Sequence, residues 1–177
     1  IEAIQIKLEK KKVTNNSLTS GLPPKSRESS NTQENVSTKK IKLGIDVSKH
    51  QGDINWSMVK SDKVEFAMIR CAYRGYTEGN INEDINFFRN VKGAYSNNIS
   101  VGLYFYSSAI NETEAIEEAN YVLSLINKYK LQNYITYPIA IDIEDFEGTR
   151  NYSLNRQERT NVVKAFCGTI KRAGYNP

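Results

Sequence analysis

The chain has 177 residues, enough for one domain of ordinary size, and 39% of them are hydrophobic. Its net charge of +4 comes entirely from residues 1–40, which hold eight Lys or Arg and four Asp or Glu, whereas residues 41–177 hold sixteen of each. The balanced charge of the larger part argues against nucleic acid as a partner. The absence of any apolar run of about 18 residues argues against a membrane span.

The first 41 residues are predicted to be a disordered linker in front of a folded part that starts at residue 42. Residues 13–40 contain almost no large apolar side chains, so they cannot bury enough surface to offset the entropy of ordering. Residues 1–12 are interpreted as a helical stub or as the end of a preceding element. A tether is the role that we expect, with a basic patch for anionic wall polymers or lipid head groups as the alternative.

Two strands are predicted at the start of the folded part. Residues 43–48 alternate with period two, which puts Asp46 on the polar face of the first strand. Residues 66–73 form the second strand, in which Arg70 lies on the face opposite to its two neighbours. Between them, Asn55 is predicted to cap a short helix.

Three longer helices are predicted from apolar residues at helical spacing. The second and third each begin with a capping box, in which an asparagine caps the helix and a glutamate follows three positions later. These pairs are Asn111 with Glu114 and Asn155 with Glu158. The three predicted apolar stripes are Ile85, Phe88, Val91 and Tyr95; Ala115, Ala119, Val122, Leu123, Ile126 and Tyr129; and Val162, Val163, Phe166 and Ile170.

The other two predicted strands are residues 101–107 and 138–144. Pro138 opens the last strand, where a missing N–H is tolerated. The strand ends in Asp142 and Glu144, and period two aims both carboxylates at the same side, about 6.6 Å apart along the strand. Charged groups at the end of a buried strand are costly unless they have a partner or a function.

Strand and helix alternate four times in the folded part, which is typical of a parallel α/β sheet or barrel. The fold class that we predict is an α/β, TIM-barrel-like (β/α) parallel barrel with the polar strand faces inside. A closed eight-stranded barrel typically has ~250 residues, and this chain stops where a fifth strand would begin. We therefore expect an incomplete barrel of about four βα units, truncated at its C-terminus.

Functional residues of parallel barrels gather at the C-terminal ends of the strands. Three carboxylates with two phenol rings suit a sugar, because acids transfer protons and flat rings stack on sugar faces. An acid in an apolar pocket keeps its proton and can protonate a glycosidic oxygen, while an ionised acid stabilises positive charge at the sugar carbon. The side chains expected in this bowl are Asp46, Arg70, Tyr104, Tyr106, Asp142 and Glu144.

Other interpretations of these residues remain open at this point. The two acids of the last strand could form a salt-bridged strand end without a catalytic role, or a hard-metal site together with Asp46; we expect no metal and no cofactor. Arg70 either pairs with carboxylates or binds substrate. His50, the only histidine, falls in a predicted turn and argues against a zinc enzyme. Cys71 and Cys167 are not expected to form a disulfide.

Several short motifs of the chain resemble, in order and spacing, those of family 25 glycoside hydrolases, the 1,4-β-N-acetylmuramidases or lysozymes of bacteria and phages. Each motif alone has little specificity, but their co-linearity is specific, and the resemblance covers residues 42–177. The motifs are residues 44–48, 51–52, 54–56, 66–70, 102–104, 141–144 and 166–177.

The resemblance implies that residues 42–177 are part of a catalytic domain that cleaves the β-1,4 bond between N-acetylmuramic acid and N-acetylglucosamine in peptidoglycan, without a metal. Glu144 would be the general acid. Asp142 would hold or polarise the acetamido group of the substrate in a substrate-assisted step, and Asp46 would position the sugar. The two tyrosines at the end of the third strand would line the groove.

The predicted partners are peptidoglycan glycan strands. We expect a monomer that acts outside the cell on the cell wall, with a signal or anchor upstream of this segment. A non-catalytic peptidoglycan-binding module and a chitinase-like glycosidase are the alternatives.

Overall fold

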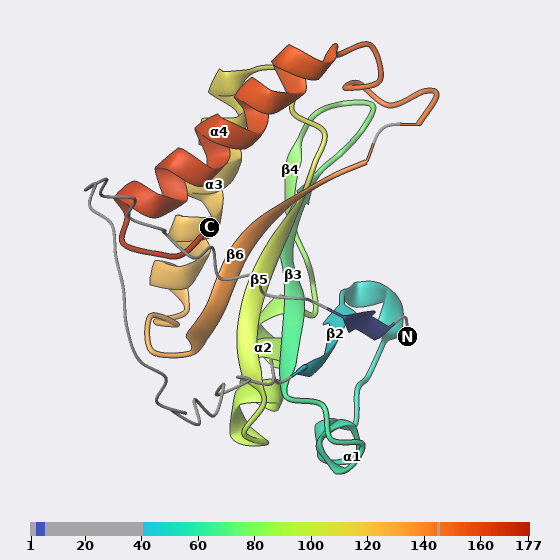
Figure 1. Cartoon of the computed structure of the whole chain (residues 1–177), viewed down its shortest axis with the longest axis vertical. Helices are drawn as coiled ribbons and strands as arrows, with labels where there is room; N and C mark the ends of the chain where they lie inside the picture. Colours follow the sequence, from blue (N-terminus) through green and yellow to red (C-terminus); the bar gives the residue numbers. More distant parts are fainter. Residues whose placement is uncertain (1–2, 6–40, 145) are drawn as a thin grey trace, which may run out of the picture.

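The computed structural model describes residues 3–5, 41–144 and 146–177. Helices and strands alternate along the chain (Figure 1). The strands are β1 (Ala3–Gln5), β2 (Leu43–Val47), β3 (Phe66–Arg74), β4 (Ile81–Glu83), β5 (Ser100–Ser107) and β6 (Ile135–Ile143). The helices are the short 3-10 helix η1 (Lys49–Gln51), α1 (Trp56–Ser61), α2 (Phe87–Ser96), α3 (Glu112–Lys128) and α4 (Arg156–Arg172).

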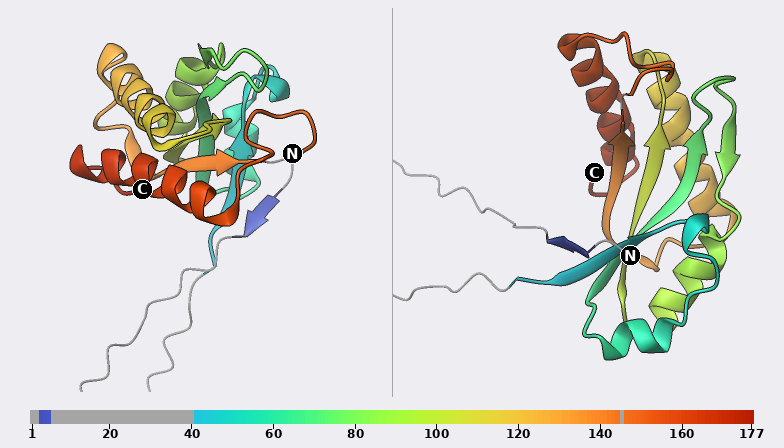
Figure 2. Two further views of the ribbon diagram at one scale, coloured as in Figure 1. Left: turned by 90° about the horizontal axis from the view of Figure 1, so that it is seen from above. Right: turned by 90° about the vertical axis from the view of Figure 1, so that its right-hand side faces the viewer.

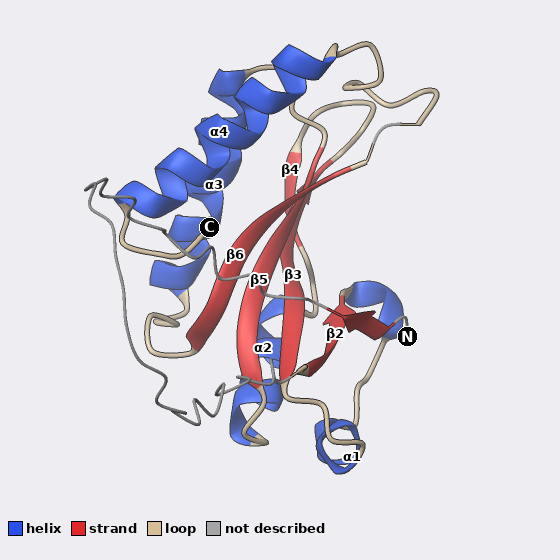
Figure 3. Cartoon of the chain, in the orientation of Figure 1, coloured by secondary structure: helices blue, strands red, loops and turns tan. Residues whose placement is uncertain are grey.

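A single twisted sheet forms the centre of the molecule (Figure 3). Strands β2, β3, β5 and β6 are neighbours in that order, and each adjacent pair runs parallel. A helix follows each of these strands, so the predicted α/β class with four parallel βα units is confirmed. Helices α2, α3 and α4 lie on one side of the sheet (Figure 2), and the other side has no helix over it in the described part of the chain.

The hydrophobic core lies between the sheet and this helical layer. Ile45 and Val47 of β2, Ile69 of β3 and Leu103 of β5 are almost completely buried there. Phe166 of α4 is fully buried against the same cluster. In the described residues no helix is both long enough and apolar enough to cross a lipid bilayer.

Two antiparallel strands extend the parallel sheet in a way that sequence patterns did not predict. β1 pairs with β2, and β4 pairs with the end of β3. At residues 3–5, where a helical stub was one interpretation, the chain is a strand. The rest of the predicted linker, residues 1–2 and 6–40, lies outside the described residues, so the linker stays a prediction.

The buried faces of the helices differ in part from the predicted stripes. In α2 the buried apolar residues are Phe87, Val91 and Ala94, whereas Ile85 precedes the helix and is 85% exposed. In α3, Leu125 is buried although it was not in the predicted stripe. The predicted helical periodicity is present, but a helix with apolar residues at adjacent positions can bury either of two faces. Packing against the sheet decides which face is buried.

The predicted helix caps are largely confirmed. Asn155 and Glu158 form the capping box at the start of α4, and Asn111 accepts a hydrogen bond from the Glu114 N–H at the start of α3. The carboxylate of Glu114 does not complete a box, however, because it accepts from the N–H of Ile110 and binds Arg150 instead.

Strand β6 begins at Ile135, three residues before the proline that was predicted to open it. The ladder to β5 is irregular between Val101 and Leu103, and the Val101 N–H donates to the hydroxyl of Thr136 rather than to a carbonyl. Pro138 lies in this irregular stretch, where its missing N–H leaves no gap in a regular ladder.

Aromatic rings fill the helix-free face of the sheet below the ends of the strands. Phe66 is paired in register with Gly44, and its ring occupies the space where a side chain at that glycine would lie. The same ring stacks on Tyr137, with centroids 4.8 Å apart. Further along the sheet, Met68 lies against Gly102 in the same way. These side chains form an apolar floor beneath the predicted site.

The close approach of Phe66 to Gly44 yields a test of this packing. Gly44→Ala should lower the free energy of unfolding by about 1–3 kcal/mol, because a β-carbon there would collide with a rigid ring. Gly168→Ala is the matched control, since its β-carbon would meet only the flexible end of Arg172, and helical alanine should stabilise by about 0.5–1 kcal/mol. Urea denaturation midpoints measure both, and equal midpoints would contradict the packing described.

Candidate active site

The register of the parallel strands brings the predicted site residues onto the helix-free face of the sheet. Arg70 on β3 is opposite Tyr104 on β5, and Tyr106 on β5 is opposite Asp142 on β6. Residues paired directly across a sheet point to the same face. Asp46 lies on the first parallel strand, β2, on the face opposite to the buried Ile45.

Asp142 lies close enough to the other two carboxylates to be influenced by both. Burial raises the pKa of Asp142 above its ordinary value, and the negative charges of Glu144 and Asp46 raise it further. The positive charge of Arg70 opposes this shift. Asp46 and Asp142 are half-buried, whereas Glu144 is exposed just beyond the end of β6. Of the three acids, Asp142 is therefore the one whose surroundings are shown to favour the protonated form.

Glu144 has one side-chain contact with the sheet. The hydroxyl of Tyr106 donates a hydrogen bond of 3.2 Å to its Oε2 atom. Burial raises the pKa of Tyr106 to about 12, and the neighbouring Glu144 charge adds to the effect, so the phenol stays protonated and remains a donor. Burial also raises the pKa of Tyr104 to about 12. Both phenols thus act as neutral groups beside the acids.

Arg70 pairs with a carboxylate, but not with one of the three site acids. Its Nε and Nη2 atoms both lie 2.8 Å from Oδ2 of Asp84. Asp84 is itself buried and accepts hydrogen bonds from the main-chain N–H groups of Lys49 and Asn86. Sequence reasoning missed Asp84, since it saw only an acid before a helix. The ion pair keeps one positive charge next to Asp142 and Tyr104.

A β-bulge in β3 adds another residue to this face. Arg70 is opposite Tyr104, but Ala72 and not Cys71 is opposite Phe105, so one extra residue interrupts the alternation. As a result Tyr73 points to the same face as Arg70, and the Arg70 guanidinium lies 5.2 Å from the centroid of its ring. Strict alternation would place this tyrosine on the opposite face.

Two more aromatic residues stand at the rim of the site. Tyr76, after β3, is 49% exposed, and Phe146, after β6, is 46% exposed. Their rings meet edge to face with centroids 5.9 Å apart. Tyr76 also contributes to the raised pKa of Tyr106, which places it near the acids. Both residues lie in loops without a repeating pattern, so the sequence offered no signal for them.

The remaining reactive side chains are elsewhere. His50 is exposed in η1, as expected for a surface role. Cys71 is buried in the bulge and Cys167 lies on α4, and both are free thiols. Among the described residues no group of three His, Cys, Asp or Glu side chains is arranged to hold a metal ion.

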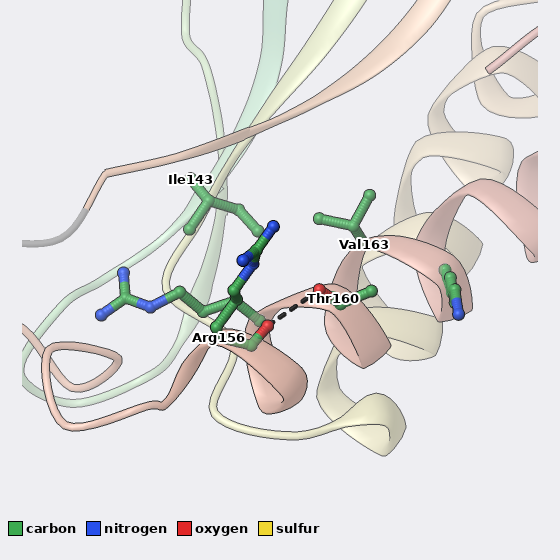
Figure 4. Close-up of a pocket in the computed structure, with 6 residues that line it drawn as sticks. Ile143, Arg156, Thr160 and Val163 are labelled. Atoms are coloured by element: carbon green, nitrogen blue, oxygen red, sulfur yellow. Dashed lines mark hydrogen bonds between the residues drawn. The ribbon is translucent and has the colours of Figure 1, made fainter.

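One hollow of the molecule is separate from the acids. It has a volume of about 680 Å³ and lies between the end of β6 and α4 (Figure 4). Ile143 and Val163 provide its apolar lining, and Arg156 and Lys164 lie beside them. Ile143 points to the helical side of the sheet, whereas Asp142 before it points to the other. A sugar bound at the acids would therefore not occupy this hollow.

Comparisons with known proteins match most of this chain to one family. The model of the family described as glycosyl hydrolases family 25 matches residues 45–177. Lysozyme M1 of Streptomyces globisporus is 34% identical over 129 residues, which are 72% of this chain and 42% of that protein.

Solved structures show the same fold. The modular autolysin LytC from Streptococcus pneumoniae has a TM-score of 0.63 at 31% identity, over 75% of this chain and 30% of that one. The catalytic domain of endolysin ply40 from bacteriophage P40 of Listeria monocytogenes has a TM-score of 0.58 at 25% identity, over 77% and 61% of the two chains. The chain thus spans less than half of the lysozyme and less than a third of the autolysin. With most of its length matched by the family model, the chain belongs to glycosyl hydrolase family 25.

Proposed function

We propose that this chain is part of a peptidoglycan hydrolase that cleaves the β-1,4 bond between N-acetylmuramic acid and N-acetylglucosamine. The observation that carries the proposal is the group of three carboxylates on the open sheet face, in which Asp142 lies within electrostatic reach of both Glu144 and Asp46. Two relatives support it: one is named a lysozyme, and the autolysin LytC has been solved in complex with a synthetic peptidoglycan ligand.

In the proposed reaction Glu144 is the general acid. Its carboxyl group gives a proton to the glycosidic oxygen while the bond from that oxygen to the sugar carbon breaks. Asp142 holds the acetamido group of the sugar whose bond breaks. The carbonyl oxygen of this acetamido group stabilises the positive charge on the sugar carbon. Water then adds to this carbon and gives a proton to the Glu144 carboxylate, which leaves a new reducing end and restores the acid. Asp46 positions the sugar and, through its charge, tunes Asp142.

Aromatic residues are proposed to form the walls of the glycan groove. Tyr104 and Tyr106 lie on the sheet beside the acids, and Tyr76 and Phe146 extend the surface at the rim. Arg70 is proposed to act mainly through its charge, because its guanidinium is already paired with Asp84. A glycan over this surface would exclude water and strengthen each electrostatic contact below it.

Several further assignments are proposals on the same basis. We infer that the protein acts as a monomer on the cell wall outside the membrane, without a metal or cofactor. The division into a linker at residues 1–41 and a partial catalytic domain at residues 42–177 is also proposed; the family match begins at residue 45.

Replacing the carboxyl group of Glu144 with an amide tests whether this residue is the proton donor. Glu144→Gln should lower the release of reducing ends from purified peptidoglycan by at least about 10²-fold, since the amide cannot protonate the leaving oxygen. Glu147→Gln, a nearby exposed acid, is the matched control and should keep full activity. Retained activity in the first variant would remove Glu144 from its role.

Binding without turnover by the unaltered protein would favour the non-catalytic module, and faster cleavage of chitin oligomers would favour the chitinase.

The raised pKa of Asp142 predicts that a neutral side chain at this position increases stability but lowers activity. Because its pKa is raised in the folded chain, the folded state holds its proton more tightly than the unfolded state, so an ionised Asp142 costs stability above its ordinary pKa. Asp142→Asn should therefore be more stable than the unaltered protein at pH 7, and the gain should fade as the pH falls toward about 3.9. The same variant should lose activity.

Urea unfolding of both proteins at pH 7 and near pH 4 measures this difference. A stability difference that stays constant over the range, or one that favours the aspartate at pH 7, would contradict the raised pKa.

A further inference from the structure

The loop that follows β6 has to hold Glu144 in place, yet its described residues form neither helix nor strand up to the start of α4. The carboxylate of Glu144 is exposed, and the described structure gives it a single side-chain bond, the one from Tyr106. One exposed hydrogen bond is too weak to fix a proton donor to within about half an ångström. The main chain of the loop must therefore be held by other contacts.

Arg150 provides the strongest of these contacts. Its Nη1 and Nη2 atoms donate to Oε2 and Oε1 of Glu114 at 2.9 and 2.7 Å, a two-bond pairing with fixed geometry. Glu114 lies in the first turn of α3 and also accepts from the N–H of Ile110 at 3.2 Å. Burial favours the protonated form of Glu114, but the bonds from Arg150 and Ile110 outweigh it and hold the pKa of Glu114 below its ordinary value.

A second contact ties the same arginine to the hairpin formed by β3 and β4. The main-chain N–H of Arg150 donates to the carbonyl of Tyr76 at 3.2 Å. Its guanidinium packs on Gly79, where a β-carbon would lie 2.7 Å from Cζ of Arg150. Gly79 has a φ of +73°, which glycine adopts without strain. Arg150 thus joins the loop to two separate elements.

The next residue, Asn151, connects Arg150 to the main chain of Glu144. Asn151 is completely buried, and its Nδ2 atom donates to the main-chain carbonyl of Glu144 at 3.1 Å. The path runs from α3 through Glu114 and Arg150 to Asn151, and from there to the backbone of Glu144.

We propose that Arg150, held by Glu114, and Asn151 are positioning residues that set the placement of the Glu144 carboxylate. This inference rests on the proposed function of Glu144. It predicts that loss of the ion pair slows the chemical step and leaves substrate affinity unchanged, because a misplacement of about 1 Å at a reacting group can cost about 10²-fold in rate.

The test measures turnover of peptidoglycan fragments by four forms of the protein: unaltered, Arg150→Met, Glu114→Gln and the double variant. Each single change should lower kcat about 10- to 100-fold with KM within about twofold. The double variant should be no slower than the worse single one, since both changes remove the same interaction. Arg89→Met is the matched control, because Arg89 forms an exposed ion pair with Asp53 away from the acids, and it should keep normal kinetics.

The inference is overturned if kcat stays within about twofold of normal, if only KM rises, or if the two losses multiply in the double variant. Arg150→Lys distinguishes a loss of the pairing geometry from a folding defect. Lysine keeps the charge but cannot form the two-bond pairing, so an intermediate kcat is expected. Full activity in this variant would contradict the proposed geometry.

Hydrogen exchange separates a failure of this inference from a failure of the proposed function. An unaltered protein that releases no reducing ends would refute the function alone. In that case, faster amide exchange at residues 144–151 in Arg150→Met, with unchanged exchange in β5, still supports the positioning role. Unchanged exchange in the loop would refute it whatever the activity.

Discussion

The proximity of Asp46, Asp142 and Glu144 is the interaction on which the rest of the structure depends. Burial raises the pKa of Asp142, and the like charges of Glu144 and Asp46 raise it further. A fold keeps such repulsion only where the surrounding structure fixes the groups in place. Here the parallel ladders on both sides of β3 and β5 fix the strand ends.

The bulge at Cys71 divides two arginines between the two faces of the sheet. Arg70 and Arg74 are four positions apart, so in a regular strand both would point to the same side. With one extra residue between them, Arg70 lies with the site acids and pairs with Asp84, while Arg74 points to α3 and binds the fully buried Glu118 at 2.8 Å. One irregularity thus supplies a positive charge to the site and an anchor for a helix.

Much of this arrangement could be predicted from the sequence. Period-two alternation placed Asp46, Asp142 and the two tyrosines of β5 on one face, and the asparagine caps marked the starts of α3 and α4. These features are local, so a short stretch of sequence contains the whole signal. The class of the fold followed from the alternation of strands and helices.

The features that could not be predicted depend on partners distant in the sequence. The bulge has no residue signature in β3, and only the register with β5 reveals it. Asp84 and Glu118 looked like ordinary surface acids until packing buried them against arginines. Likewise, Glu114 fitted a capping box by spacing, but Arg150, 36 residues later, binds its carboxylate.

The central claim concerns the electrostatic contact among the three acids, and a carboxyl NMR titration of Asp142 tests it most directly. The pKa of Asp142 should be raised in the unaltered protein, and it should fall in both Asp46→Asn and Glu144→Gln, because each change removes one of the neighbouring charges that raise it. An Asp142 pKa that is the same in all three proteins would contradict the claim that these carboxylates share one site.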